Sequence, residues 1–162
     1  MTSIFRAILW AACVPALALT GSSTAPLLAQ TATGAGTTGG TVTVNATNLR
    51  SAKGVVRACM TTNAKRFPRC SDDPNSHRMT VPAANTVSFT FTNVASGKYA
   101  IALLHDENAN GKADRALSMI PKEGFGFSRD AKVRMGPPNF RDAVFDFAGD
   151  SASQTIRMRY LL

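Results

Sequence analysis

Two segments of the chain alternate between apolar and polar side chains. In TVTVNAT (41–47) and in most of VSFTFTNV (87–94), every second residue is apolar, and Ser, Thr or Asn stand between. A period of two is typical of a strand with one buried face and one face in water. Both segments are therefore predicted to be strands.

Four further segments have strand character. GVVRACM (54–60) and KYAIALLHD (98–106) are more continuously apolar, as expected of central strands, whereas DAVFDF (142–147) and SQTIRMRYL (153–161) alternate. Turn-forming residues separate the segments, and none has a sustained helical period. The pattern predicts an all-β fold, namely an antiparallel β-sandwich with an immunoglobulin-like or transthyretin-like layout; a small β-barrel is the alternative.

One segment, from His105 to about Arg141, has little strand pattern. Connections longer than about 12 to 15 residues in a compact domain are usually functional or disordered. Its aromatic content favours order, so we expect a long ordered loop whose rings either pack on the sandwich or form a binding surface, and whose glycines provide tight turns. The rings are Phe125, Phe127 and Phe140, and the glycines are Gly124, Gly126 and Gly136.

The first 40 residues lack this alternation. Residues 1–29 combine Arg6, an apolar run and small residues near Ala18 and Ala29, which is typical of a secretory signal peptide, with cleavage after Ala29 preferred. The apolar run is too short to span a membrane, and no later segment is long enough either. Residues 30–40 are predicted to be a flexible linker, and residues 41–162 a single β-sandwich domain.

Export changes the interpretation of the cysteines. Cys13 lies in the predicted signal, where lipidation is an alternative, and Cys59 and Cys70 remain. In an oxidising compartment these two are expected to form a disulfide, worth about 3 kcal/mol for a loop of this length. A zinc site is the alternative, but only His77 lies nearby, and a structural zinc site needs four ligands.

The chain is basic, with a formal net charge of +8. Nucleic acid is not the expected partner, because the protein is predicted to be exported and its arginines are scattered without interleaved aromatic residues. Solubility and weak attraction to anionic envelope surfaces explain the charge more simply.

The segment HDENANGKAD (105–114) has the spacing of a calcium loop. Side-chain oxygens at alternate positions, a glycine at the sixth and a backbone carbonyl at the seventh would surround one Ca2+ ion. The residues at positions one, three, five, six, seven and nine are Asp106, Asn108, Asn110, Gly111, Lys112 and Asp114.

The segment departs from a helix-loop-helix calcium site in two ways. It follows a predicted strand, and the twelfth position is Leu117 instead of glutamate. Further oxygens would have to come from Glu107, Glu123, Asp130 or water, and the affinity would be modest, on the order of 0.1 to 1 mM. The alternative is a metal-free turn, because Asn, Asp and Gly are favoured in any tight turn.

A catalytic role has less support. His105, Asp106, Glu123 and Asp130 lie in or near one loop, but no nucleophile elbow, zinc-binding helix or phosphate-binding glycine loop is present. His105 continues a core-facing side of its strand, and His77 is expected in a solvated loop. We therefore expect a binding or structural adaptor module, with another envelope protein or a glycan as partner. Carbohydrate or small-molecule binding through the 120–140 loop is the alternative, ahead of a metal-dependent hydrolase.

Three motifs in this order resemble an exported bacterial family, the domain of unknown function 2141. They are HDENANGKAD, IPKEGFGFS and GPPNFRDAVFDF, and the likeness covers residues 41–162. The resemblance implies an exported β-sandwich-like domain, periplasmic or secreted, from a Gram-negative bacterium, and it implies no activity. Ala109 stands where the family often has glycine.

Overall fold

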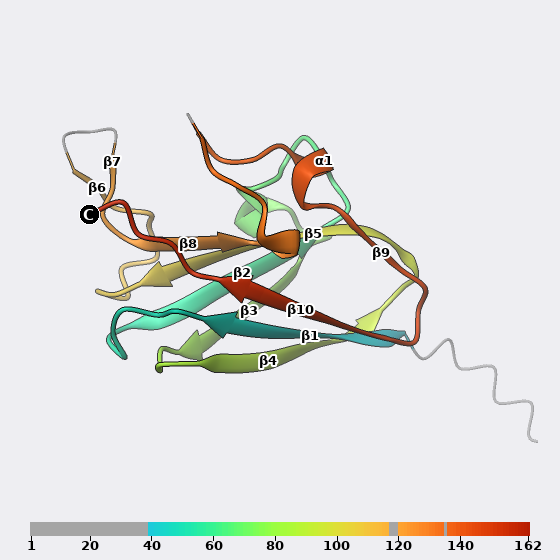
Figure 1. The fold of residues 1–162 in the computed structure, drawn as a ribbon. Coiled ribbons are helices and arrows are strands. Elements are labelled where there is room, and N and C mark those ends of the chain that lie inside the picture. Colours follow the sequence, from blue (N-terminus) through green and yellow to red (C-terminus); the bar gives the residue numbers. More distant parts are fainter. Residues whose placement is uncertain (1–38, 117–119, 135) are drawn as a thin grey trace, which may run out of the picture. The chain divides into compact units, whose positions relative to one another are not determined.

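The computed structural model describes residues 39–116, 120–134 and 136–162. Alternating side chains build a three-stranded sheet in the order β10-β1-β4 (Figure 1). Its strands are β1 (Gly40–Thr47), β4 (Val87–Val94) and β10 (Ser151–Arg157). The predicted signal peptide and nearly all of the predicted linker lie outside the described residues.

The more apolar segments form the centre of a five-stranded sheet in the order β3-β2-β5-β8, with β9 also paired to β5. A separate two-stranded hairpin, β6-β7, lies within the predicted long loop. The strands are β2 (Val55–Thr61), β3 (His77–Pro82), β5 (Gly97–Asp106), β6 (Arg115–Ala116), β7 (Ile120–Pro121), β8 (Gly124–Phe127) and β9 (Phe145–Phe147).

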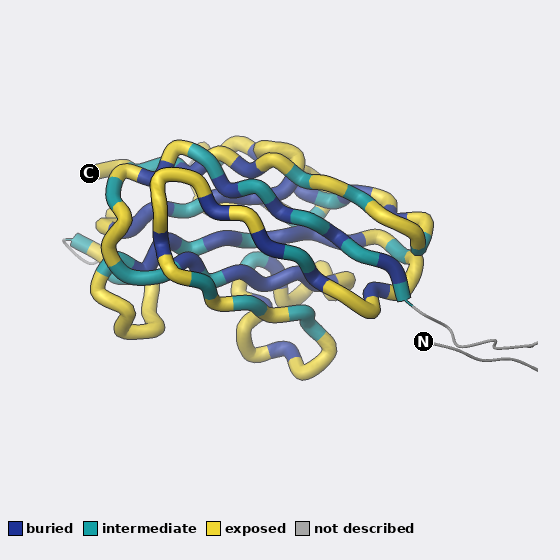
Figure 2. The backbone as a smooth tube through the Cα atoms, turned by 90° about the horizontal axis from the view of Figure 1, so that it is seen from below, coloured by how far each residue is buried: buried dark blue, intermediate teal, exposed yellow. Residues whose placement is uncertain are grey.

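The main core lies between the two larger sheets. Along β1 every second residue is buried, as Figure 2 shows by the alternation of colours, and Val42 and Val44 are fully enclosed. They belong to one cluster with Phe91 of β4, Met60 of β2 and Ile101 of β5. The sheets do not close into a ring. The prediction of a β-sandwich is confirmed, and the barrel alternative is set aside.

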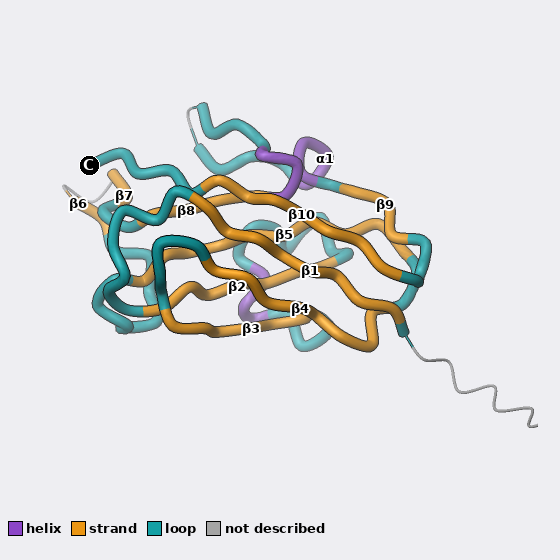
Figure 3. The backbone as a smooth tube through the Cα atoms, turned by 60° about the horizontal axis from the view of Figure 1, so that its bottom comes forward, coloured by secondary structure: helices purple, strands orange, loops and turns teal. Residues whose placement is uncertain are grey.

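Three local expectations were wrong or incomplete. β10 runs parallel to β1, as their arrows show in Figure 1, so one of the sheets is mixed; Figure 3 shows the two strands side by side. His77 does not lie in a solvated loop: it begins β3, and its ring lies 6.1 Å from both Phe91 and Tyr99. The first two residues of the predicted strand 142–147 belong to a helical turn, α1 (Phe140–Ala143), which a capping box at Asn139 begins.

Gly124 and Gly126 were expected to provide tight turns, and this was wrong. Both lie in β8, which pairs with β5, and both are buried. A Cβ atom on Gly124 would lie 2.3 Å from the Tyr160 ring, and one on Gly126 would lie 2.7 Å from Ile156. Glycine is required here because another part of the chain passes directly over the strand.

A second, smaller cluster packs on the other side of the five-stranded sheet. It contains Phe67, Phe127 and Ala143, and the partly buried Phe125 and Phe140 pack against it. The expected disulfide joins Cys59 to Cys70 beside this cluster; Cys59 lies in β2, and Cys70 begins the short helix η1 (Cys70–Asp72). A second short helix, η2 (Ser128–Asp130), follows β8. No helix in the described ranges is long and apolar enough to cross a membrane.

Candidate functional site

The 106–114 turn begins at a buried carboxylate. Asp106 is the last residue of β5 and is fully enclosed. Its oxygens accept hydrogen bonds from the backbone N–H groups of Asn110 (3.0 Å) and Gly111 (2.8 Å) and from Arg57 Nε of β2 (2.7 Å). Burial by itself would raise the pKa of Asp106, but these donors outweigh burial and the pKa is lowered. The carboxylate therefore stays charged and holds the turn in place.

Two positions in the turn have left-handed backbone conformations. Gly111 has φ +80°, which glycine adopts without strain, whereas Ala109 has φ +56°. An alanine in this region is strained, whereas glycine would adopt the same conformation without strain.

The two asparagine side chains converge on one carboxylate oxygen. Asn108 Nδ2 and Asn110 Nδ2 lie 2.8 and 2.9 Å from Asp114 Oδ2. Their amide oxygens accept the backbone N–H groups of Asn110 and Lys112, which are Asx-turn contacts. Hydrogen bonds among residues of the turn itself therefore close it.

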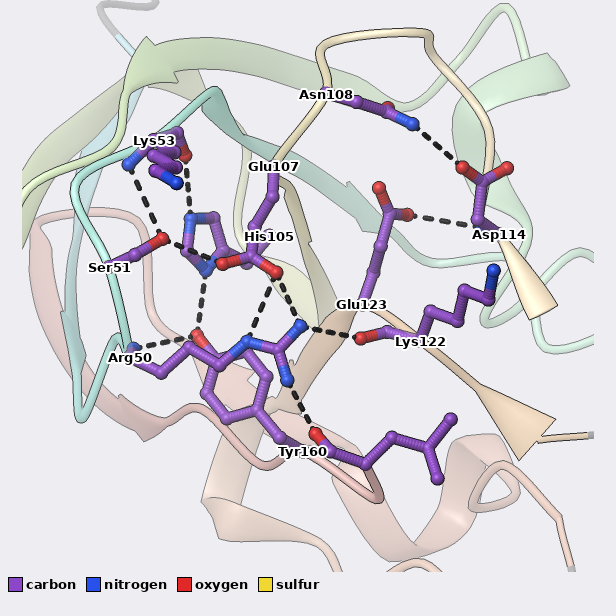
Figure 4. A network of polar contacts seen from close by, with 11 residues as sticks. Arg50, Ser51, Lys53, His105, Glu107, Asn108, Asp114, Lys122, Glu123 and Tyr160 are labelled. Atoms are coloured by element: carbon purple, nitrogen blue, oxygen red, sulfur yellow. Dashed lines mark hydrogen bonds and ion pairs between the residues drawn. The ribbon is translucent and has the colours of Figure 1, made fainter. Parts of the chain in front are cut away.

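Glu123, which directly precedes β8, adds a third carboxylate. Its side chain points toward Asp114 and Asn108 (Figure 4), and its Oε2 accepts the Asp114 backbone N–H at 3.2 Å. Only 4% of Glu123 is exposed, and its Oε1 is buried without a hydrogen-bond partner. Burial, and then the charges of Asp106 and Asp114, raise the pKa of Glu123. A buried, unpaired carboxylate oxygen is costly, so this position favours a proton or a cation.

The structure therefore brings together five of the six residues that we predicted as metal ligands through side chains or carbonyls. The sixth, Lys112, is exposed and contributes its N–H to the Asn110 side chain. Within the described ranges, no three His, Cys, Asp or Glu side chains are already arranged around a metal position. A cation would need amide oxygens as well. Calcium binding stays a prediction. The five residues brought together are Asp106, Asn108, Asn110, Asp114 and Glu123.

Comparison with family models matches residues 44–155 to uncharacterized proteins conserved in bacteria (DUF2141). The chain belongs to this family. The match extends from β1 to β10 and includes both the turn and Glu123. Comparisons with curated proteins and with solved structures gave no match.

Next to the turn, this DUF2141 domain has a polar network that the sequence did not reveal. Arg50 donates to Glu107 Oε2 (3.0 Å from Nε) and to the backbone oxygens of Lys122 and Leu162, while Ser51 donates to Glu107 Oε1 at 2.6 Å (Figure 4). These donors come from the β1–β2 connection. They lower the pKa of Glu107 to about 2, with the Arg50 hydrogen bond as the largest cause. The network connects the turn to the chain terminus.

His105 belongs to the same network and is fully buried, as its position on the core-facing side of β5 led us to expect. Its Nε2 lies 2.9 Å from the Lys53 carbonyl oxygen, so this nitrogen carries the hydrogen. Its Nδ1 then accepts from Tyr160 Oη at 2.7 Å, and the Arg50 backbone N–H donates to the same hydroxyl. Both ring nitrogens are engaged within the protein. His105 therefore links the β1–β2 connection to Tyr160.

The three phenylalanines of the predicted binding surface contact the second cluster. Phe127 is 5% exposed, and its ring centroid lies 5.8 Å from that of Phe67. Phe140 is 6.0 Å from Phe67, and Phe125 is 6.1 Å from Phe127. These are the contacts of loop-to-core packing, so a binding role for the rings stays a prediction.

Proposed function

We propose that this chain is an exported, non-enzymatic β-sandwich module that binds Ca2+ at its 106–114 turn and acts as a binding or structural adaptor in the bacterial envelope. The N-terminal signal pattern and the Cys59–Cys70 disulfide support export. Engagement of both His105 nitrogens supports a role without acid-base chemistry.

One observation carries the calcium proposal: the buried Glu123 Oε1 has no hydrogen-bond partner and faces a turn that already holds Asp106 and Asp114. The negative charges of Asp106 and Asp114 act on the Glu123 carboxylate, and Arg57 offsets only part of the charge of Asp106; a divalent cation would remove the remaining repulsion. The Asn108 and Asn110 amides already point to Asp114. Rotating each amide by 180° would present its oxygen in place of its NH2 group, at the cost of the hydrogen bonds that these oxygens accept from the backbone of Asn110 and Lys112.

A bound cation would connect two elements that are distant in sequence. Asp106 ends β5, and Glu123 directly precedes β8, so a shared ion would fix the hairpin β6-β7 between them. The proposed role of Ca2+ is therefore to stiffen the surface formed by this connection. In the absence of calcium, a proton on Glu123 relieves the same repulsion, so calcium affinity should fall as the pH is lowered.

The test is the melting temperature of the purified, oxidised protein in EDTA, in 10 mM CaCl2 and in 10 mM MgCl2. A dissociation constant of 0.1 to 1 mM predicts a calcium-dependent rise of roughly 5 to 10 °C. Magnesium should give a smaller rise, because it requires a tighter octahedral site.

Two variants and one control assign the effect to the turn. Glu123→Gln removes the buried negative charge and keeps an oxygen that accepts the Asp114 N–H. This variant should therefore melt at a higher temperature than wild type in EDTA at neutral pH, and it should lose most of the calcium response. Asp114→Asn should also lose the response. The control is Asp146→Asn, which changes the 80% exposed ion-pair partner of Lys98 and should leave the calcium response unchanged. A wild type indifferent to calcium, or equal responses in all variants, would leave the turn as a metal-free Asx corner.

A further inference from the structure

A second site lies in the connection between β8 and β9, away from the calcium turn. The chain leaves β8 at η2 and returns at α1 (Figure 1). A cleft of about 650 Å³ lies along this connection. Four basic side chains line it, together with Pro137 and Pro138: Arg129, Lys132, Arg134 and Arg141.

The acidic residues of the same segment are engaged with other groups. Asp130 forms an ion pair with Arg159 at 2.7 Å. Asp142 accepts the Asn139 backbone N–H at 3.3 Å in the capping box, and its second oxygen lies 3.7 Å from Arg141 Nε. Asp142 also lines the cleft, so four basic side chains stand there against one acidic side chain, which leaves an excess of positive charge.

Two of the basic side chains have no carboxylate partner. Lys132 and Arg134 are exposed and form no ion pair with any residue in the described ranges. The remaining residues, 1–38, 117–119 and 135, include no Asp or Glu, so the chain has no further carboxylate to offer them. Arg129 donates to the Val144 carbonyl oxygen at 3.2 Å, which fixes its guanidinium beside the cleft.

We propose that this cleft binds a phosphate group carried by a small molecule or a lipid headgroup. Its volume falls in the range of small-ligand sites, roughly 300 to 1,000 Å³. Guanidinium groups bind phosphate through paired N–H donors, and lysine adds a mobile point charge. Concentrated charge of one sign also increases the local concentration of anions. This inference does not depend on calcium binding at the turn.

The test is a titration of the isotope-labelled, oxidised protein, followed by amide chemical shifts. The soluble probes are inorganic phosphate, glucose 6-phosphate and, as the neutral control, glucose. We expect saturable shifts for residues 129–142 with both phosphates and none with glucose. A matched arm measures cosedimentation with vesicles of phosphatidylglycerol and of phosphatidylcholine.

Two double variants that remove the same amount of charge distinguish binding in the cleft from attraction to positive charge elsewhere on the surface. Lys132→Gln with Arg134→Gln should weaken phosphate or phosphatidylglycerol binding at least tenfold. Lys53→Gln with Lys122→Gln, two exposed lysines outside the cleft, should change binding less than twofold. Saturable binding of soluble phosphate identifies a free ligand, and binding of phosphatidylglycerol vesicles alone identifies a headgroup. Equal weakening by both double variants, or no binding of any phosphate probe, would overturn the proposal.

Discussion

At the scale of single residues, charged side chains in this protein are held by donors from distant parts of the sequence. Glu107 was considered only as an additional calcium ligand, yet it accepts from Arg50 and Ser51. Nothing in its neighbours along the chain indicated these partners. The carboxylates of the turn, by contrast, are spaced within nine residues, so the sequence alone could assign Asp106 and Asp114 to one turn, in which Asn110 contacts both side chains.

Glu107 makes a specific prediction about pH. Its pKa of about 2 lies below the usual 4.5, so its contribution to stability is complete above pH 4.5 and is lost as the pH falls through about 2. Glu107→Gln should destabilise the protein by about 1 to 2 kcal/mol at pH 7 and by nearly nothing at pH 2. Urea unfolding at pH 7, 4, 3 and 2 measures this difference.

The control is Asp146→Asn, which removes a carboxylate from an ion pair that is largely in water. Its effect should be negligible at each pH. If Glu107→Gln lowers stability equally at pH 7 and pH 2, the charge of Glu107 is not what stabilises the network.

At the scale of elements, the alternating strands β1 and β4 were predictable, whereas β8, which is determined by close contact with another part of the chain, was not. β1 and β4 alternate because one face is in water. β8 has the sequence GFGF, in which glycine ordinarily indicates a turn. Its glycines are instead required by Tyr160 and Ile156, which lie more than 29 positions further along the chain.

The contact between β8 and Tyr160 can be tested with alanine substitutions. Gly124→Ala would push the Tyr160 ring away, because the new Cβ would lie 2.3 Å from it, and would break the hydrogen bond to His105. We expect a loss of about 3 kcal/mol in the free energy of unfolding. Gly136→Ala meets nothing within 4 Å and should change stability by less than about 0.5 kcal/mol. Chemical denaturation compares the two, and equal effects would refute the role of the contact.

At the scale of the whole molecule, two core clusters lie on opposite sides of one sheet, and a disulfide fastens the smaller side. Cys59 of β2 is bonded to Cys70, eleven positions further along the chain. The disulfide restricts the unfolded chain. For a loop of this length, its removal should lower the free energy of unfolding by about 3 kcal/mol. The double variant Cys59→Ala with Cys70→Ala should unfold at lower urea concentration than wild type.

Reducing agent provides the matched comparison. It should lower the unfolding midpoint of wild type toward that of the double variant and leave the double variant unchanged. A wild type that is equally stable with and without reducing agent, measured after complete reduction, would contradict a stabilising role for the bond.

The sequence by itself determined which residues of β1 and β4 face the core, because strand periodicity is a local property that a period of two reveals. It also determined the cysteine pair and the spacing of the turn, since each depends on few residues. Only the tertiary structure decided that β10 runs parallel to β1, that Tyr160 covers Gly124 and that four basic side chains line one cleft. Each of these features depends on the order of the strands across the two sheets. Bringing together segments that are far apart in the sequence costs little more free energy than bringing together nearer ones, so the local pattern does not determine which segments meet.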